Sequence, residues 1–359
     1  MKFIHIADMH FDTPFMLLNS KGDFGKIRRM DQREILKKII NYIKENNIEY
    51  LFIAGDFYEH NYIRQSTIEY INDLFKQIPK TKIFITPGNH DPYVVNSMYR
   101  NFTWNNNVKI FTSKIEKVET DEANIYGVGF EDFYCEKSDI ENIILEDKSK
   151  INVLIAHGSL NASDKAQLQY NPINKSKLEK VGFDYVALGH IHKPNYNTEN
   201  NQKIIYPGST IAMGFDELGK HGFIVGSIEK DKLEIAFIPV DKREFKEIEV
   251  NITEINDEDE LLEKINNIYL KEDNLYKIIL IGERNFEINI NNLYKFIDKE
   301  NIIKIKNKTR LNYNLEKMVN DNTLKGIFIN EIKEELTKNN YTKEELDKIL
   351  EIGLSILEN

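Results

Sequence analysis

Short apolar runs alternate with amphipathic stretches along the first 190 residues of the chain. Over residues 30–45 and 66–78, apolar positions recur every three or four residues, which predicts two helices. The apolar runs have the length of strands, and they are Lys2–Ala7, Tyr50–Ala54, Lys82–Thr86, Asn152–Ala156 and Tyr185–Leu188. This alternation predicts an α/β layered architecture.

From about residue 203 the pattern changes to strand, turn and strand. Three apolar segments follow one another with short polar connections, and they are Lys203–Tyr206, Gly222–Ile228 and Leu233–Val240. We expect these segments to form a second, largely antiparallel sheet that packs on the first. The predicted core, residues 1–240, is therefore a two-sheet β-sandwich flanked by helices.

A domain boundary near Asp241 is marked by charged residues and by the acidic run at 257–260. Beyond it the pattern predicts strand, helix, strand, helix and strand, which make a small α/β capping domain over residues 241–310. Residues 311–359 form a predicted helical tail, with one helix from about Asn314. A second helix is opened by Thr342-Lys343-Glu344-Glu345, a capping-box pattern. The wide apolar face of that helix either packs on the small domain or docks a partner.

Composition places the chain among globular proteins of a reducing compartment. Of its 359 residues 41% are hydrophobic, and a single cysteine, Cys135, excludes an intramolecular disulfide. No apolar run approaches the roughly 18 residues that a membrane span requires. The first strand reaches Asp8 too early for a secretory signal. We therefore expect a cytoplasmic protein that is not inserted in a membrane.

The formal net charge of −10 is unfavourable for independent binding of nucleic acid, because phosphates favour a basic surface. Residues 241–359 contain 19 Lys and Arg against 26 Asp and Glu, which gives −7. The first 240 residues contain 29 against 32, which gives −3. Most of the negative charge lies outside the predicted core, so the charge is compatible with a DNA substrate.

Residues of the metal-ligand type stand in five clusters, each directly after an apolar run. They are Asp8 with His10, Asp56, Asn89 with His90 beside it, His157, and His190 with His192. Side chains at the carboxyl edge of a sheet converge on one crevice. Carboxylate and amide oxygens mixed with imidazole nitrogens, without thiolate, suit a hydrolytic centre that holds two divalent cations.

Local spacing supports this convergence at two of the clusters. Asp8 and His10 stand at i and i+2, so in extended backbone they would point the same way. Gly55 precedes Asp56 and lets the chain turn sharply after its strand.

The order of these motifs resembles the calcineurin-like metallophosphoesterase superfamily over residues 1–240. The matching motifs are Asp-x-His, Gly-Asp, Gly-Asn-His-Asp, an isolated His and Gly-His-x-His. The resemblance implies that Asp8, His10, Asp56 and His192 bind one metal ion, and that Asp56, Asn89, His157 and His190 bind the other. The two ions would lower the pKa of a water that attacks phosphorus, and neutralise the developing charge.

The resemblance gives His90 a catalytic role instead of a ligand role. It would stabilise the transition state or protonate the leaving oxygen, with Asp91 orienting its ring. Mn²⁺ is the metal that the family implies, although the ligand set itself also suits Fe or Zn. Glu59 and His60 follow the Gly-Asp motif, at a place where some relatives carry a histidine, and they stay outside the predicted site.

Within the superfamily the chain is most similar to the DNA-repair exonuclease branch, the SbcD nuclease subunits and YhaO-like proteins. The similarity lies in residues 8–15, 55–59, 189–194 and 206–210, and in the layout of core, cap and helical tail. It implies a Mn²⁺-dependent 3′-to-5′ exonuclease with weaker endonuclease activity. It also implies an SMC-like coiled-coil ATPase bound by the C-terminal helices, and a homodimer.

Two other functions remain open at this point. One is a phosphodiesterase for small nucleotides or other diesters, and the other is an adaptor for the ATPase with vestigial catalysis.

Other polar residues are given structural roles. His5 alternates with apolar residues in the first strand and is expected in the core, as is Trp104. Residues 21–29, with four basic side chains, are interpreted as a solvated loop. The alternative interpretation is that this loop approaches DNA. His221 lies outside every motif, and Gly127-Val128-Gly129 is interpreted as strand or bulge because no third glycine follows at dinucleotide-loop spacing.

Overall fold

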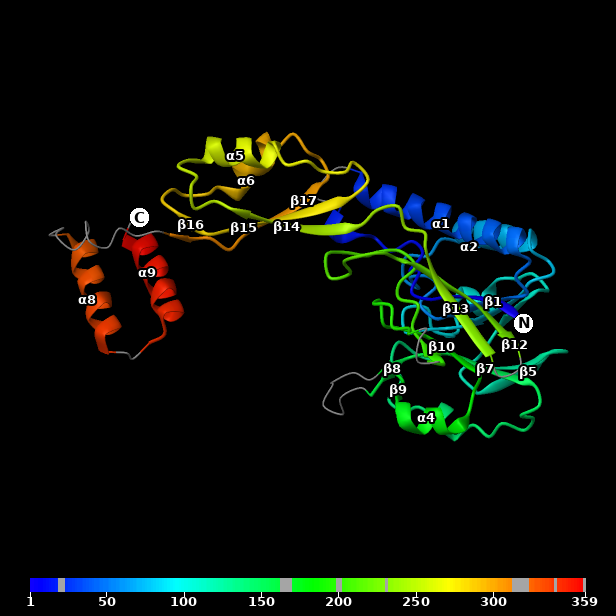
Figure 1. The fold of residues 1–359 in the computed structure, drawn as a ribbon. Helices are drawn as coiled ribbons and strands as arrows, with labels where there is room; N and C mark the ends of the chain where they lie inside the picture. The colour runs from blue at the N-terminus through cyan, green and yellow to red at the C-terminus, as the bar shows by residue number, and fades with distance from the viewer. Residues whose placement is uncertain are drawn as a thin grey trace. The chain divides into compact units, whose positions relative to one another are not determined.

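The computed structural model describes residues 1–18, 23–161, 170–197, 202–229, 232–311, 323–338 and 341–357. The chain divides into two compact units, Met1–Phe245 and Lys246–Asn359. The first unit runs from blue to green in Figure 1, and the second is yellow to red. The finer division of the C-terminal part into a cap at 241–310 and a tail at 311–359 stays a prediction.

The first sheet of the N-terminal unit has six strands in the order β13-β12-β1-β2-β3-β4. Neighbours among β1 to β4 run parallel, whereas β12 pairs antiparallel with both β1 and β13. The strands are β1 (Lys2–Ile6), β2 (Tyr50–Ala54), β3 (Lys82–Thr86), β4 (Val108–Ile110), β12 (Gly222–Glu229) and β13 (Lys232–Pro239).

The second sheet has five strands in the order β11-β10-β7-β6-β5. Its neighbours run parallel except for the antiparallel pair β5 and β6. The strands are β5 (Glu116–Glu119), β6 (Ala123–Val128), β7 (Ile151–His157), β10 (Tyr185–Gly189) and β11 (Ile204–Ile205). The segment Gly127-Val128 is thus strand, as predicted.

The prediction that residues 203–240 form the second sheet is wrong. The hairpin of β12 and β13 extends the first sheet beside β1, and only β11 joins the second. The physical reason is that β12 covers the otherwise open edge of β1, which local alternation along the chain does not reveal. The two-sheet sandwich flanked by helices is nevertheless confirmed.

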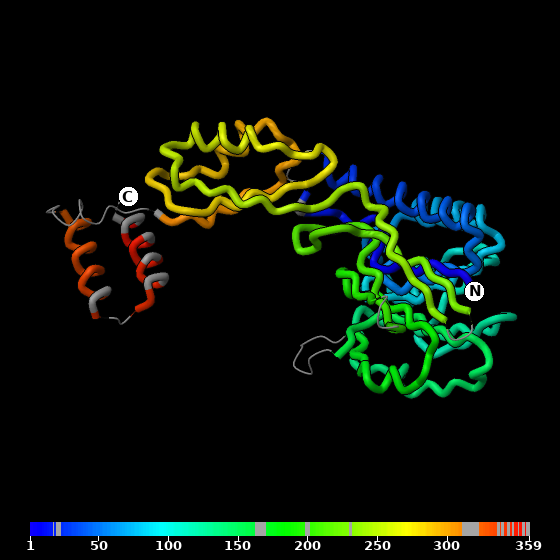
Figure 2. The backbone as a smooth tube through the Cα atoms, viewed as in Figure 1, coloured from blue at the N-terminus to red at the C-terminus, as the bar shows by residue number. Residues whose placement is uncertain are grey.

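Helices cover the outer faces of both sheets, as Figures 1 and 2 show for α1 and α4. Residues of α1 and α2 pack against Ile4, Leu51 and Ile83 of the first sheet. Leu178 of α4 packs against Leu154 of the second sheet. The helical segments are η1 (Met16–Leu18), α1 (Phe24–Asn46), α2 (Gln65–Lys76), α3 (Met98–Asn101), η2 (Ile140–Asn142) and α4 (Lys175–Val181), and β8 (Ser159–Leu160) pairs with β9 (Pro172–Ile173).

The space between the sheets is filled by aromatic and branched side chains. Phe3, Phe52 and Phe84 of the first sheet meet Val153 and Tyr185 of the second. Because strand side chains alternate between faces, Phe52 faces the second sheet while its neighbours in β2 face the helices. This explains why β2 reads as a continuous apolar run instead of an alternating one.

Residues 24–29 are helical, so the loop predicted at 21–29 is wrong over this part. The helix α1 begins at Phe24, and Arg28 is fully buried within it. The Arg28 guanidinium donates to Asp241 at 2.6 Å and to Asp31 at 3.1 Å. The buried arginine and its two acidic partners hold this turn in the helix. The sequence shows that residue 28 is basic, but not that it is buried and paired.

The C-terminal unit contains a three-stranded sheet in the order β14-β15-β17. Apolar residues of α5 and α6, among them Leu261 and Leu293, pack with Ile278 and Ile302 of the sheet. The elements are β14 (Phe245–Asn251), α5 (Glu258–Asn266), β15 (Leu275–Ile281), β16 (Glu283–Arg284), α6 (Ile290–Phe296), β17 (Ile302–Asn307) and β18 (Arg310–Leu311). The predicted order of strands and helices is confirmed here.

Two further helices follow, α8 (Leu324–Lys338) and α9 (Lys343–Leu357), which pack through Ile329, Ile332, Leu346 and Leu350. The predicted capping box is present, because Thr342 N donates to Glu345 Oε2 at 2.8 Å and Glu345 N donates to Thr342 Oγ1 at 3.3 Å. For the helix expected from about Asn314, the part up to residue 322 lies outside the described residues.

Among the helices that the structure describes, none is sufficiently long and apolar to traverse a bilayer.

Candidate metal centre

The predicted site residues lie at the carboxyl ends of five strands that belong to both sheets. Asp8 follows β1, Asp56 follows β2, and Asn89 with His90 follows β3. His157 ends β7, while His190 and His192 follow β10. Backbone hydrogen bonds join these ends, from Asp8 N to Gly55 O at 3.1 Å and from Gly158 N to Gly189 O at 3.2 Å. The two sheets therefore present all five clusters at one edge.

Several site residues have left-handed backbone conformations, which side chains other than glycine adopt rarely. The φ angles are 50° for Asp8, 48° for His10, 50° for Asp56 and 102° for His190. The prediction that Asp8 and His10 share a direction through extended backbone is therefore wrong. Their side chains converge because the chain turns twice after β1, and such strain concentrates at functional sites.

Gly55 makes the turn before Asp56, as predicted from the sequence. Its φ of +81° favours glycine, and an added Cβ would lie 2.3 Å from His157 Nδ1. The position therefore has to be free of a side chain for two reasons, one conformational and one steric.

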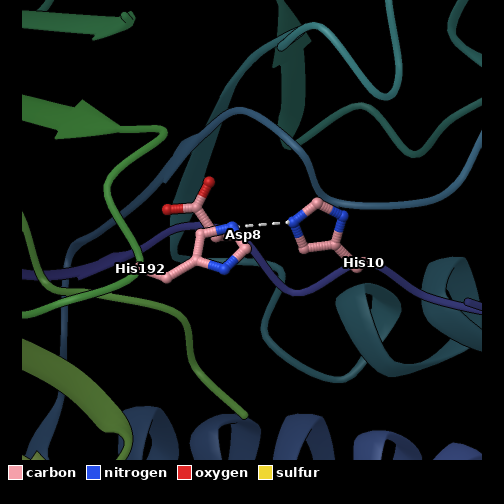
Figure 3. Close-up of side chains that lie close together, drawn as sticks. All are labelled: Asp8, His10 and His192. Atoms are coloured by element: carbon pink, nitrogen blue, oxygen red, sulfur yellow. Dashed lines mark hydrogen bonds between the residues drawn. The ribbon is translucent and has the colours of Figure 1, made fainter. Parts of the chain in front are cut away.

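One group of possible ligands consists of Asp8, His10 and His192, with ligand atoms within 4.8 Å of one another. Figure 3 shows a ring nitrogen of His10 directed at a ring nitrogen of His192, beside the Asp8 carboxylate. Their Nε2 atoms are 3.2 Å apart. Asp8 is held in place by the backbone N–H of His190, which donates to both carboxylate oxygens at 2.9 and 3.1 Å.

A second group consists of Asp56, His157 and His190. His157 Nε2 is 3.2 Å from Asp56 Oδ2 and 3.0 Å from Asn89 Oδ1. Asn89 Oδ1 is also 3.2 Å from His190 Nδ1. Asp56 further lies 3.9 Å from His10 Nε2, so it stands between the two groups.

Three imidazoles are oriented by partners outside the centre. His10 Nδ1 is 2.8 Å from Glu59 Oε1, His192 Nδ1 is 2.6 Å from Glu217 Oε1, and His157 Nδ1 is 2.9 Å from the Ala54 carbonyl. Each ring thereby presents Nε2 to the centre. Such outer partners are characteristic of histidines that bind metal.

The carboxylates in and around the centre raise the pKa of two of its imidazoles, whereas the pKa of a third is lowered. Burial lowers the pKa of His157, but the charge of Asp56 outweighs it and raises the pKa to about 9. In His192 burial is outweighed by the hydrogen bond to Glu217 and the charge of Asp8, so the pKa rises to about 9. Burial and the charge of His157 lower the pKa of His190 to about 4. Carboxylates, an amide oxygen and inward imidazole nitrogens together fit divalent cations.

His90 lies at the exposed side of this centre, where its ring, His10 and Asp56 form a third group of possible ligands. Burial lowers its pKa, but the hydrogen bond to Glu59 and the charge of Asp56 outweigh burial and raise it to about 9. The partner of its ring is Glu59, whose Oε2 is 3.0 Å from His90 Nδ1. Glu59 therefore contacts both His10 and His90. The predicted orientation of His90 by Asp91 is wrong.

Asp91 instead ties two loops of the centre together. Its carboxylate accepts from the backbone N–H groups of Asp56 at 3.1 Å, Phe57 at 2.6 Å and Gly88 at 2.6 Å. It also accepts from the Tyr99 hydroxyl at 2.6 Å. With its oxygens bound to these buried donors, Asp91 fixes the turn that carries Asn89 and not the ring of His90.

Sequence reasoning missed Glu217 and the residues behind it. Ser209 Oγ donates to Glu217 Oε2 at 2.7 Å and lies 2.9 Å from His221 Nδ1. Glu217 is 25 positions after His192 in a polar segment without a motif, so nothing in the sequence marked it. His221 thus supports the centre indirectly, while His5 lies in the core and Trp104, partly buried, packs against it.

Comparison with known proteins was consistent with this geometry. The model of the calcineurin-like phosphoesterase family matches residues 1–194. The uncharacterized metallophosphoesterase YhaO of Bacillus subtilis (strain 168) is 24% identical over 281 residues, 76% of this chain and 68% of YhaO. The SbcD component of the nuclease SbcCD from Staphylococcus epidermidis is 28% identical over 287 residues, 70% of this chain and 72% of SbcD.

Among solved structures, the protein TT1561 of Thermus thermophilus aligns with 67% of this chain and 98% of its own, with 9% identity and a TM-score of 0.39. The family match spans more than half of the chain and includes every residue of the predicted site. The chain therefore belongs to the calcineurin-like phosphoesterase family, and it is a hydrolase that acts on phosphoester bonds.

Proposed function

We propose that this protein is a Mn²⁺-dependent DNA exonuclease that hydrolyses phosphodiesters with a two-metal centre in DNA repair. The observation that carries the proposal is the pair of ligand groups that meet at Asp56. Similarity to the SbcD component of the nuclease SbcCD supports DNA as the substrate. The expected polarity is 3′-to-5′, with a weaker endonuclease activity.

In this proposal each group of side chains holds one divalent cation. Asp8, His10 and His192 hold the first, Asn89, His157 and His190 hold the second, and Asp56 contributes to both. When bound there, the cations would supply a nucleophilic water of lowered pKa and charge stabilisation at the phosphoryl oxygens. Glu59 and Glu217 keep the His10 and His192 rings in the orientation that binding requires.

His90 is the proposed acid for the leaving oxygen. Its side chain is 45% exposed beside the buried ligands, and the hydrogen bond to Glu59 and the charge of Asp56 raise the pKa of the ring against the effect of burial. A protonated, accessible ring can approach a bound phosphodiester and donate to the departing oxygen. Glu59 orients this ring through Nδ1, which leaves Nε2 as the donating atom.

Digestion of end-labelled linear DNA with Mn²⁺ tests the proposal. EDTA should abolish cleavage, and His90→Gln should lower kcat by about 10² to 10⁴ while the bound metal is unchanged. His60→Gln is the matched control, because His60 follows Glu59 but belongs to none of the three possible ligand groups. Cleavage that persists in EDTA, or turnover of small diesters without any action on DNA, would refute the DNA exonuclease.

The tail helices are the proposed contact with a coiled-coil ATPase. Ile327 of α8 and Ile352 and Ile356 of α9 are 62%, 61% and 67% exposed. Exposed isoleucines on two packed helices suit an apolar partner surface. Deletion of residues 314–359 should abolish co-purification with the ATPase and leave cleavage of small diesters intact. A homodimer is also proposed, and sedimentation of the whole chain would test it.

A further inference from the structure

A basic cleft lies beside the metal centre on the N-terminal unit. Its volume is about 600 Å³, and its lining includes Lys26, Arg29, Arg33, Arg64, Asp12 and Tyr62. Four cationic side chains and one carboxylate give a formal charge of +3, counted as four minus one. The chain as a whole carries −10. The cleft is therefore positively charged, although the net charge of the protein is negative.

The cations of the cleft differ in how far they are neutralised. Arg33 is paired with Asp12 at 2.9 Å and also donates to Thr67. Arg29 donates to the Pro14 carbonyl, which carries no formal charge. For Lys26 and Arg64, both exposed, no side-chain partner is present among the described residues. Within the described part of the chain, two cations are therefore held at the cleft without a counter-charge.

Asp12 connects the two sides of the cleft through hydrogen bonds. Its carboxylate accepts from Arg33 of α1, and also from the backbone N–H of Arg64 at 3.1 Å and Thr67 Oγ1 at 2.7 Å. These bonds fasten the start of α2 to α1 and fix the Arg64 backbone. A single carboxylate thus places cations from two helices around one opening.

The cleft is joined directly to the loop that carries the metal ligands. Asp12 is two residues after His10, and Gln32, next to Arg33, donates to the His10 carbonyl at 2.7 Å. Arg64 is five residues after Glu59, which contacts His10. Five residues span at most about 18 Å, so the backbone of Arg64 lies within that distance of Glu59. At about 3.4 Å per nucleotide this is at most roughly five nucleotides.

We propose that this cleft binds the phosphate backbone of the DNA strand whose phosphodiester occupies the metal centre. Arg29 and Arg64 offer guanidinium forks that match phosphate oxygens, and Lys26 adds a mobile charge. Tyr62, which is 54% exposed at the rim, offers a face on which a base stacks. The inference deepens the proposed function and rests on it for the identity of the strand.

The double variant Lys26→Gln/Arg64→Gln tests the cleft, because neither side chain has a partner among the described residues whose loss would disturb the fold. The matched control is Lys80→Gln/Lys180→Gln, which removes two exposed cations from the end of the α2–β3 connection and from α4. Binding of a fluorescein-labelled single-stranded DNA is measured by anisotropy in EDTA, over a range of salt concentrations. Turnover of bis(p-nitrophenyl) phosphate with Mn²⁺ is measured in parallel.

We expect the cleft variant to bind DNA about 10- to 100-fold more weakly at about 50 mM salt, and its salt slope to fall by about 1.4. Its turnover of the small diester should equal that of the wild type, and the control should match the wild type throughout. Equal weakening in both double variants would overturn the inference, as would normal binding by the cleft variant.

The same data separate this inference from the proposed function. If the wild type binds DNA through the cleft but never cleaves it, the exonuclease proposal fails and the cleft stands. If the wild type cleaves DNA and the cleft variant binds normally, the cleft fails alone. A wild type that does not bind DNA would overturn both.

Discussion

Replacement of Gly55 by alanine should damage both the metal centre and the stability of the fold. The glycine has a φ of +81°, and its Cβ would lie 2.3 Å from Nδ1 and 2.6 Å from Cγ of His157. These His157 atoms belong to a buried ring that is hydrogen-bonded to the Ala54 carbonyl. The new methyl group therefore forces His157 or the turn itself to move.

The expected cost has two parts. A left-handed conformation costs an alanine about 1 to 2 kcal/mol, and overpacking in a closed core costs about 1 to 3 kcal/mol. We expect the free energy of unfolding to fall by about 2 to 5 kcal/mol in total. Because His157 loses its orienting bond, affinity for Mn²⁺ should fall about 10- to 100-fold.

Gly182 provides a matched control for the conformational part. Its φ is +89°, but an added Cβ would meet nothing within 4 Å. Gly182→Ala should therefore cost only about 1 to 2 kcal/mol and leave metal affinity unchanged. Urea unfolding is followed by fluorescence of Trp104, the single tryptophan, which packs in the core of the same unit.

The reasoning is refuted if Gly55→Ala and Gly182→Ala lose equal stability and bind Mn²⁺ equally well by calorimetry. That result would mean that the turn after β2 tolerates a side chain, and that the position of His157 does not depend on it.

Three further predictions concern buried polar groups. Glu217→Gln should weaken Mn²⁺ binding about 10- to 100-fold by calorimetry, because the amide orients His192 less strongly; unchanged affinity would exclude this role. Arg28→Met should lower stability by about 3 to 5 kcal/mol in urea unfolding, because buried Asp241 loses the guanidinium from which it accepts and Asp31 loses one of its cations; an unchanged midpoint would contradict this. Burial lowers the pKa of His5 to about 3 from 6.5, so the folded state excludes a proton that the unfolded state binds. Stability should therefore fall as pH decreases below about 6.5, by about 2 kcal/mol at pH 5, and urea titrations of His5→Gln should lack this slope.

The sequence was sufficient for the strands and for the ligand clusters, because both are local signals. Tyr50–Ala54 and Lys82–Thr86 have the predicted bounds, since a buried parallel strand is a continuous apolar run with polar ends. The carboxylate, amide and imidazole side chains at the strand ends indicate metal binding by their type alone. A prediction from such signals requires no knowledge of which strands are neighbours.

The remaining features depend on distant contacts. The place of β12 beside β1 and the bond between Glu217 and His192 join segments that share no local pattern. The left-handed angle at Asp8 was also hidden, because aspartate adopts it only when surrounding structure compensates for the strain. The partner of His90 was misassigned for a similar reason: Asp91 is adjacent in sequence, yet its carboxylate is occupied by backbone donors.

The contribution of both sheets to one centre also links metal supply to the lifetime of the protein. Ligands from Asp8 to His192 meet only after the N-terminal unit has assembled, so the unfolded chain offers no comparable binding site. A cation at about 100 times its dissociation constant would then add about 2.7 kcal/mol to the stability of the folded state. In a cell starved of metal, this enzyme would be degraded faster as well as being less active, and its abundance would follow the metal available to it.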